Sequence, residues 1–180
     1  MVTLEFSRYR HDIHNAISKL DRNGQCKFAA WCCNVVLKDE EVRSFLAQRP
    51  GGKAFLGKLE GVLDDIRRDL CADRARVENL VEVTGPFRPE GVLGDVQARE
   101  VSEQSHVLSS LEVIDAFLGW GLSGSASYLE ECAVARLDRV GLLIEFDALD
   151  AGALEKEASS QLRVLSDLSV RQRPTLSIQG

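Results

Sequence analysis

The sequence predicts an all-α fold, a single-domain bundle of about seven or eight helices. Apolar residues recur at intervals of three and four along almost the whole chain, which is typical of helices with one buried face. No segment shows sustained strand alternation, and the connections between the periodic segments are short. The chain has 180 residues, 44% of them hydrophobic, and is long enough to bury one core. We therefore expect one helical domain over residues 1–170 and a flexible tail over residues 171–180.

The first half of the chain contains four strongly periodic segments and a weaker fifth. The first covers residues 6–20, and the DRNG sequence after it predicts a stop and a turn. The second covers residues 28–36. Asp39 is placed to cap a short third helix, which the Pro-Gly-Gly sequence at residues 50–52 should end. A fourth helix is predicted over residues 55–70, and a fifth over about residues 73–83.

Three further helices are predicted beyond a clear loop. Residues 84–91 hold two prolines and two glycines, which excludes a helix there. The next periodic segment covers residues 107–118 and is expected to stop near Gly119, in the sequence GWG. The following segment covers residues 129–144, with Ser125 or Ser127 as its cap, and the last covers residues 154–168.

The cysteines predict buried, reduced thiols. There are five, an odd number that includes an adjacent pair: Cys26, Cys32, Cys33, Cys71 and Cys132. Cys32 extends the helix face of Phe28 and Ala29, so we expect it to be more buried than Cys33. A zinc or redox site is the alternative. The chain has no C-x-x-C motif, however, and two adjacent cysteines on a helix cannot easily aim both sulfurs at one metal ion.

No residue pattern predicts catalysis, a cofactor or a metal ion. His11 and His14 share a helix face at the spacing of metal ligands, but they flank the buried stripe and are expected at the surface. His106 lacks the context of a catalytic base, and the glycine-rich sequence after residue 118 lacks a phosphate-binding lysine. Asp115 lies in an apolar helix, where partial burial would require an ion pair with a residue such as Arg136 or Arg139.

The charge is unevenly distributed. The net charge is −6, of which residues 1–60 contribute +3 and residues 61–180 contribute −9. This argues against nucleic-acid binding, which needs a basic surface, and favours docking of a basic protein. That the acids serve solubility stays the alternative. Seven acidic residues are candidates for a partner-binding surface: Asp64, Asp65, Asp69, Asp73, Glu130, Glu131 and Asp138.

The chain has neither an apolar run of about 20 residues nor a signal sequence, so we expect no membrane association and a cytoplasmic protein.

Two motifs resemble the YjaG-like family, a group of bacterial domain-of-unknown-function proteins. Residues 28–34, FAAWCCN, resemble its F-A-A-x-C-C-E helix, and residues 107–118 resemble its x-Y-P-A-L-D-A-x-x-A-L helix. Residues 55–70 and 133–145 follow the same order of helices, so the resemblance covers most of residues 15–146. Asn34 stands in place of the family's acid, and a Ser-Ser pair in place of its Tyr-Pro. The resemblance implies an all-helical protein without established catalytic residues.

Three functions are compatible with these features. The first is a non-enzymatic binding protein, most concretely an immunity or antitoxin-type inhibitor that masks a toxin or effector protein through its acidic surface. The second is a housekeeping interaction or regulatory protein of the YjaG-like family, for which a homodimer is one option. The third is a metal-dependent enzyme, which the chain supports least because no ligand or nucleophile pattern is present.

Overall fold

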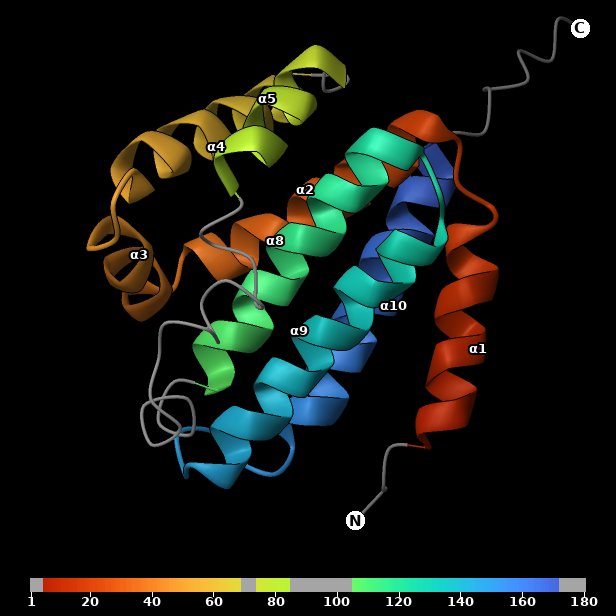
Figure 1. The fold of residues 1–180 in the computed structure, drawn as a ribbon. Helices are drawn as coiled ribbons and strands as arrows, with labels where there is room; N and C mark the ends of the chain where they lie inside the picture. Colours follow the sequence, from red (N-terminus) through yellow and green to blue (C-terminus); the bar gives the residue numbers. More distant parts are fainter. Residues whose placement is uncertain (1–4, 69–73, 85–104, 172–180) are drawn as a thin grey trace, which may run out of the picture.

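The computed structural model describes residues 5–68, 74–84 and 105–171, and it confirms the all-α fold. Eight helices and no strand occupy these ranges (Figure 1). Their bounds are α1 Phe6–Ile17, α2 Arg22–Leu37, α3 Glu40–Ala47, α4 Gly52–Arg67, α5 Arg74–Thr84, α8 Ser105–Ser123, α9 Ser127–Glu145 and α10 Ala153–Arg171. Apart from Thr84, the predicted loop lies outside the described residues, as do Cys71 and the predicted tail beyond Arg171.

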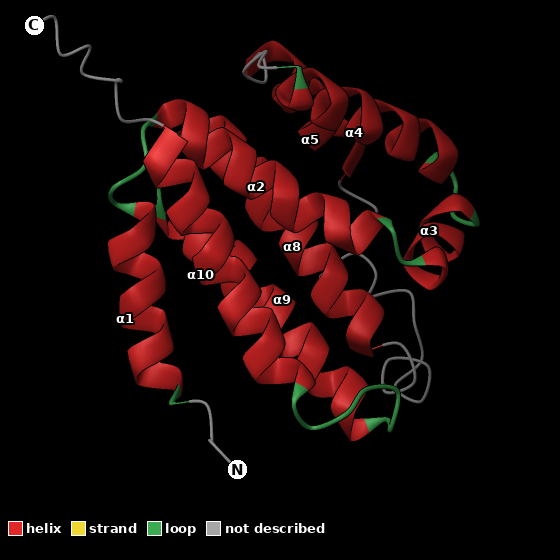
Figure 2. Cartoon of the chain, turned by 180° about the vertical axis from the view of Figure 1, so that it is seen from behind, coloured by secondary structure: helices red, strands yellow, loops and turns green. Residues whose placement is uncertain are grey.

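The helices fall into two groups. Helices α1, α2, α8, α9 and α10 form what we call the five-helix bundle, in which α8 and α9 run antiparallel and make the most extensive contact (Figure 1). Helices α3, α4 and α5 form the three-helix layer, which lies on one side of α2 and α8 (Figure 2). Within the described ranges, no helix combines the length and the apolar character needed to cross a membrane.

Helix α2 lies between the bundle and the layer, and this explains its composition. It contacts α8, α9 and α10 on one side and α3 and α4 on the other. Small residues and thiols therefore fill positions all around it, and Cys32 and Cys33 are both fully buried. The prediction that Cys32 is the more buried of the two was wrong, because helices pack against α2 on both sides and both thiols are fully buried.

Two predicted helix boundaries are confirmed or refined by capping contacts. The Asp39 side chain accepts a hydrogen bond of 2.9 Å from the Glu41 backbone N–H and caps α3, as predicted. The predicted turn after residue 20 is also the start of α2, because the Asp21 side chain accepts a hydrogen bond of 2.7 Å from the backbone N–H of Gly24.

The predicted serine cap of α9 is wrong. Ala126 occupies the N-cap position, and no side chain bonds to the first turn. The Ser125 and Ser127 hydroxyls instead lie 2.8 Å from each other.

The predicted helix stop near Gly119 is also wrong, since α8 continues to Ser123. A Cβ atom at Gly119 would lie 2.6 Å from the Tyr128 ring of α9, and one at Gly121 would lie 2.7 Å from Val77 of α5. These glycines therefore allow neighbouring helices to approach α8 closely and do not end it. The helix ends at Gly124, whose φ of +75° is in the left-handed region that favours glycine.

Candidate functional site

The acidic residues on α4 are already paired with arginines of the chain. Asp64 lies 2.6 Å from the Arg67 guanidinium, and Asp65 forms an ion pair with Arg76 of α5. A guanidinium that already neutralises a carboxylate leaves it little attraction for a partner's cation. Two more of the predicted residues lie outside the described residues: Asp69 and Asp73.

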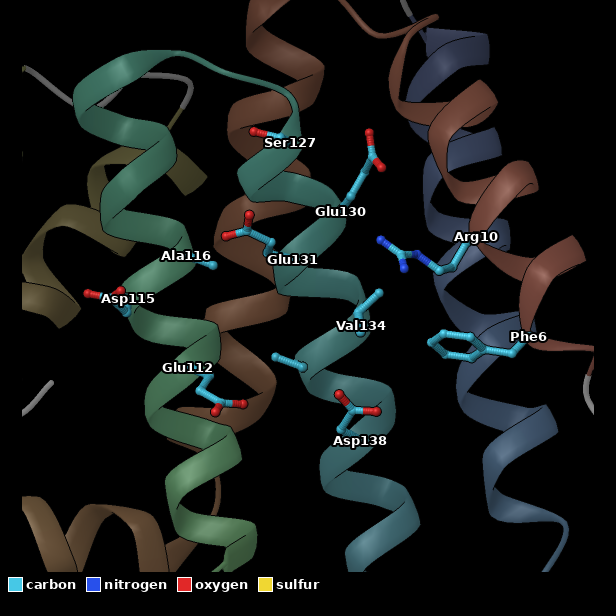
Figure 3. Close-up of a pocket in the computed structure, with 11 residues that line it drawn as sticks. Phe6, Arg10, Glu112, Asp115, Ala116, Ser127, Glu130, Glu131, Val134 and Asp138 are labelled. Carbon is cyan, nitrogen blue, oxygen red and sulfur yellow. The ribbon is translucent and has the colours of Figure 1, made fainter. Parts of the chain in front are cut away.

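The other three predicted acidic residues line a groove of about 510 Å³ along the outer face of α9 (Figure 3). Helix α8 borders the groove on one side and α1 on the other. Its charged and aromatic lining comprises Glu112 and Asp115 of α8, Glu130, Glu131 and Asp138 of α9, and Phe6 and Arg10 of α1. Five acidic residues and one arginine thus line the groove, so its net charge attracts cations and repels phosphates.

Glu130 is tied to α1 by a histidine. The Nδ1 atom of His14 lies 2.8 Å from its Oε1 atom. His11 contacts Asn15 instead, and both histidines are exposed, as predicted. The two rings therefore have separate partners. Among the described residues, no group of three histidine, cysteine or acidic side chains is arranged to hold a metal ion.

Glu131 and Asp138 are the available carboxylates of the groove. In the part of the chain that the structure describes, neither forms an ion pair or a side-chain hydrogen bond. They lie seven residues apart, which places them on the same helix face, about 10 Å from each other along the axis. Val134, labelled in Figure 3, and Ala135 also line the groove and lie between them along α9. Partial burial raises the pKa of the Asp138 carboxyl, because desolvation disfavours its charged form.

The opposite face of α9 holds a buried polar network. Arg136 is 3% exposed, and its Nη2 atom lies 2.7 and 2.9 Å from the two carboxylate oxygens of Glu157 on α10. Its guanidinium also lies 3.8 Å from the ring centroid of Trp31. The fully buried Gln161 donates to Glu157 at 2.7 Å, and the Tyr9 hydroxyl donates to Gln161 at 2.7 Å. This network joins α1, α2, α9 and α10.

The two arginines predicted as partners of Asp115 each form an ion pair with another carboxylate. Arg136 binds Glu157, and Arg139 forms an ion pair with Asp39, the cap residue of α3. Sequence reasoning missed Gln161 because it lies beside Leu162, which fits the apolar stripe of α10 better. The structure buries Gln161 completely and leaves Leu162 half-buried.

Four free thiols of the described residues lie buried in the core. Cys26, Cys32, Cys33 and Cys132 are all free and buried. Burial raises the pKa of Cys32 to about 12 and holds the pKa values of Cys33 and Cys132 well above the usual range. A protonated, buried thiol is a poor nucleophile and a poor metal ligand. These cysteines therefore act as packing residues, as predicted.

The third histidine joins the layer to the bundle. His106 is 6% exposed at the start of α8, and its Nε2 atom lies 3.0 Å from a carboxylate oxygen of Glu41 on α3. The contact is between helices of the two groups, away from the groove on α9.

No family model, curated protein or solved structure matches this chain at a significant level. The resemblance to the YjaG-like family therefore stays a prediction from its two motifs.

Proposed function

We propose that this protein is a non-enzymatic binding protein that docks a basic segment of a partner protein on the outer face of α9. The observation that supports this proposal is the state of the two carboxylates at Glu131 and Asp138. Both are unpaired among the described residues and share one groove, whereas Asp64 and Asp65 are paired with arginines. Charge complementarity of this kind speeds and selects protein association.

In its most concrete form, the proposal is an immunity or antitoxin-type inhibitor that acts in the cytoplasm on a basic toxin or effector protein. The support is the charge of −9 over residues 61–180 and the burial of Cys32 and Cys33, whose raised pKa values make these two thiols poor nucleophiles. An inhibitor needs a complementary surface and no chemistry of its own.

A homodimeric regulatory protein, as in the YjaG-like alternative, is favoured by a different surface. Phe146 is 49% exposed and Leu149 is 41% exposed, both directly after α9. Exposed apolar side chains that lie close together can bury each other across a twofold axis. A dimer that dissociates on Phe146→Ser with the charge of α9 unchanged would support this alternative.

The inhibitor proposal is tested by affinity capture from the native host. A captured partner is expressed with and without this protein, and inhibition of growth in its absence is expected. Association is then measured by surface kinetics for wild type, Glu131→Lys and Asp138→Lys, with Asp64→Lys as the matched control. Each reversal on α9 should slow association about tenfold or more at low salt, and the control should have a smaller effect.

Salt provides the second readout. Raising the salt from about 50 to about 500 mM shortens the screening length roughly threefold, so wild-type association should slow and the two α9 reversals should depend less on salt. An affinity that responds neither to salt nor to Glu131→Lys and Asp138→Lys would contradict the proposal. The acids would then serve solubility.

A further inference from the structure

A second cavity extends the acidic groove along α9. It has a volume of about 350 Å³ and is lined mainly by apolar side chains, among them Phe6 of α1, Leu137 and Leu142 of α9, and Leu154 of α10. Phe6 and Asp138 line both cavities, so the acidic and the apolar parts meet at these two residues. The two cavities thus adjoin each other along α9, and we treat them together as one groove.

The groove has the length of a short helix. Leu142 lies eleven positions after Glu131 on α9, which corresponds to a rise of about 16 Å or three helical turns. The end near Glu131 is lined mainly by acidic residues, the end near Leu142 is lined mainly by apolar residues together with Glu145, and Asp138 lies between the two ends. A bound molecule would therefore need cationic groups near Glu131 and mainly apolar groups near Leu142.

Gly141 leaves the apolar part open. A Cβ atom built on Gly141 would meet no other atom within 4 Å, although the residue is in the interior of α9 and lines the second cavity. An alanine at this position would stabilise the helix relative to glycine, because alanine has the higher helix propensity. The glycine therefore leaves free volume at the floor of the groove, next to Leu142 and Leu137.

We infer that the occupant of this groove is a basic amphipathic helix of the partner protein, with one large apolar side chain between Phe6 and Leu154 and with lysines or arginines over Glu131 and Asp138. The inference rests on the proposed function and names the class of segment that is bound. Apolar anchors at helical spacing are the usual way in which a helix binds a groove. The groove repels nucleic acids and anionic lipids, because carboxylates line most of its length.

The environment of Asp138 also favours an occupant that has a cation next to an apolar side chain. The carboxyl group is partly desolvated where the acidic and apolar parts meet. A cation placed beside an apolar anchor would gain more from this carboxylate than from a fully hydrated one, because screening by water is weaker there. A peptide with charge but without an apolar face would not use this position.

The test uses three synthetic peptides of about 14 residues, roughly four helical turns. The first has leucines at helical spacing and lysines elsewhere, the second has the same composition in an order without helical periodicity, and the third has glutamates in place of the lysines. Binding of each to the full-length protein is measured by calorimetry. We expect the first peptide to bind about tenfold or more tightly than the second, and the third not to bind.

Two substitutions at Gly141 test the location. Gly141→Leu should fill the apolar part and weaken binding of the first peptide about tenfold, whereas Gly141→Ala should have little effect. Gly57→Leu on α4, where a Cβ atom also meets nothing within 4 Å, is the matched control and should bind as wild type does. Urea unfolding of each variant shows whether it is folded.

The outcomes distinguish this inference from the proposed function. Equal binding of the first two peptides, or no effect of Gly141→Leu in a folded variant, would overturn the amphipathic helix but leave charge-directed docking at Glu131 and Asp138 intact. Loss of binding on Gly141→Leu but not on Asp138→Lys would refute the acidic site itself. A wild-type dimer that Gly141→Leu converts to a monomer would show that a second copy of this chain occupies the groove, which also overturns the inference.

Discussion

The three-helix layer and the five-helix bundle use their acidic residues in different ways. In the layer, Glu60 lies 2.5 Å from Arg43, so that α4 is joined to α3, and Asp65 pairs with Arg76, so that α4 is joined to α5. On the outer face of α9, Glu131 has no such partner among the described residues. Glu60 and Asp65 of the layer thus hold its helices together, whereas Glu131 and Asp138 of α9 are available to another molecule. A count of charges does not distinguish these two cases.

Both regions contain an ion pair between an arginine and a glutamate, but the two pairs differ in burial. Arg136 and Glu157 of the bundle are 3% and 14% exposed, whereas Arg43 and Glu60 of the layer are 38% and 44% exposed. A buried pair that loses one partner leaves an uncompensated charge without water, whereas an exposed pair is solvated again. The comparison therefore predicts unequal costs for two chemically similar substitutions.

The largest effect is expected for Glu157→Leu. The substitution leaves the buried Arg136 guanidinium without a counter-charge and should lower the free energy of unfolding by about 3–5 kcal/mol. Urea unfolding measures the change. Glu60→Leu in the layer is the matched control and should cost less than about 1 kcal/mol. Equal costs for the two variants would show that the buried network does not stabilise the bundle.

The next effect concerns the packing of the layer. Leu59 is fully buried on the face of α4 that also carries Val62 and Ile66. Leu59→Ala should cost about 2–5 kcal/mol through lost burial and the cavity that remains. The exposed Lys53 of the same helix provides the control, since Lys53→Ala should change stability by less than about 0.5 kcal/mol. A cost below about 1 kcal/mol for Leu59→Ala would indicate that the layer packs loosely on the bundle.

The adjacent cysteines test the position of α2 between the two regions. Because both thiols are fully buried, Cys32→Ser and Cys33→Ser should each destabilise by about 1–3 kcal/mol, as expected for a buried hydroxyl without a good partner. Unfolding in urea under reducing conditions measures both. The hypothesis of a single buried helix face predicts a clear loss for Cys32→Ser and little change for Cys33→Ser, so the pair of values decides between one-sided and two-sided burial.

The sequence predicts helices well where burial follows a simple period, and less well where three helices meet. The stripe from Phe55 to Ile66 is buried as its spacing indicates, because α4 has one inner and one outer face. The sequence predicts a helix end at Gly119, whereas the structure shows that this glycine makes room for the Tyr128 ring of α9. The local sequence around Gly119 contains no sign of that contact, because it depends on how α8 and α9 pack.

The candidate site could be predicted only in part for the same reason. The spacing places Glu131 and Asp138 on one face of a helix, but their lack of partners depends on which cations other helices bring near. Arg67 and Arg76 neutralise the equivalent acids of α4 through contacts that depend on the fold. His14 likewise reaches Glu130 across 116 positions of the chain.

The smallest change in the free energy of unfolding is expected for Asp138→Asn. We expect this variant to be stabilised, whereas the corresponding substitution in the layer should not be. Burial raises the pKa of Asp138 above its value in the unfolded chain, so the folded protein binds more protons over the pH range between the two values. Stability due to this group is therefore lost as the pH rises through that range, and Asp138→Asn should be more stable than wild type at about pH 7. The gain should vanish at a pH below the ordinary carboxyl pKa of about 3.9.

Asp64→Asn in the layer, which removes an ion pair, is the control and should give no gain in stability at either pH. Urea unfolding at the two pH values measures both variants. A loss of stability for Asp138→Asn at neutral pH would mean that the α9 carboxylate stabilises the fold like those of the layer, and that it is not held available for a partner.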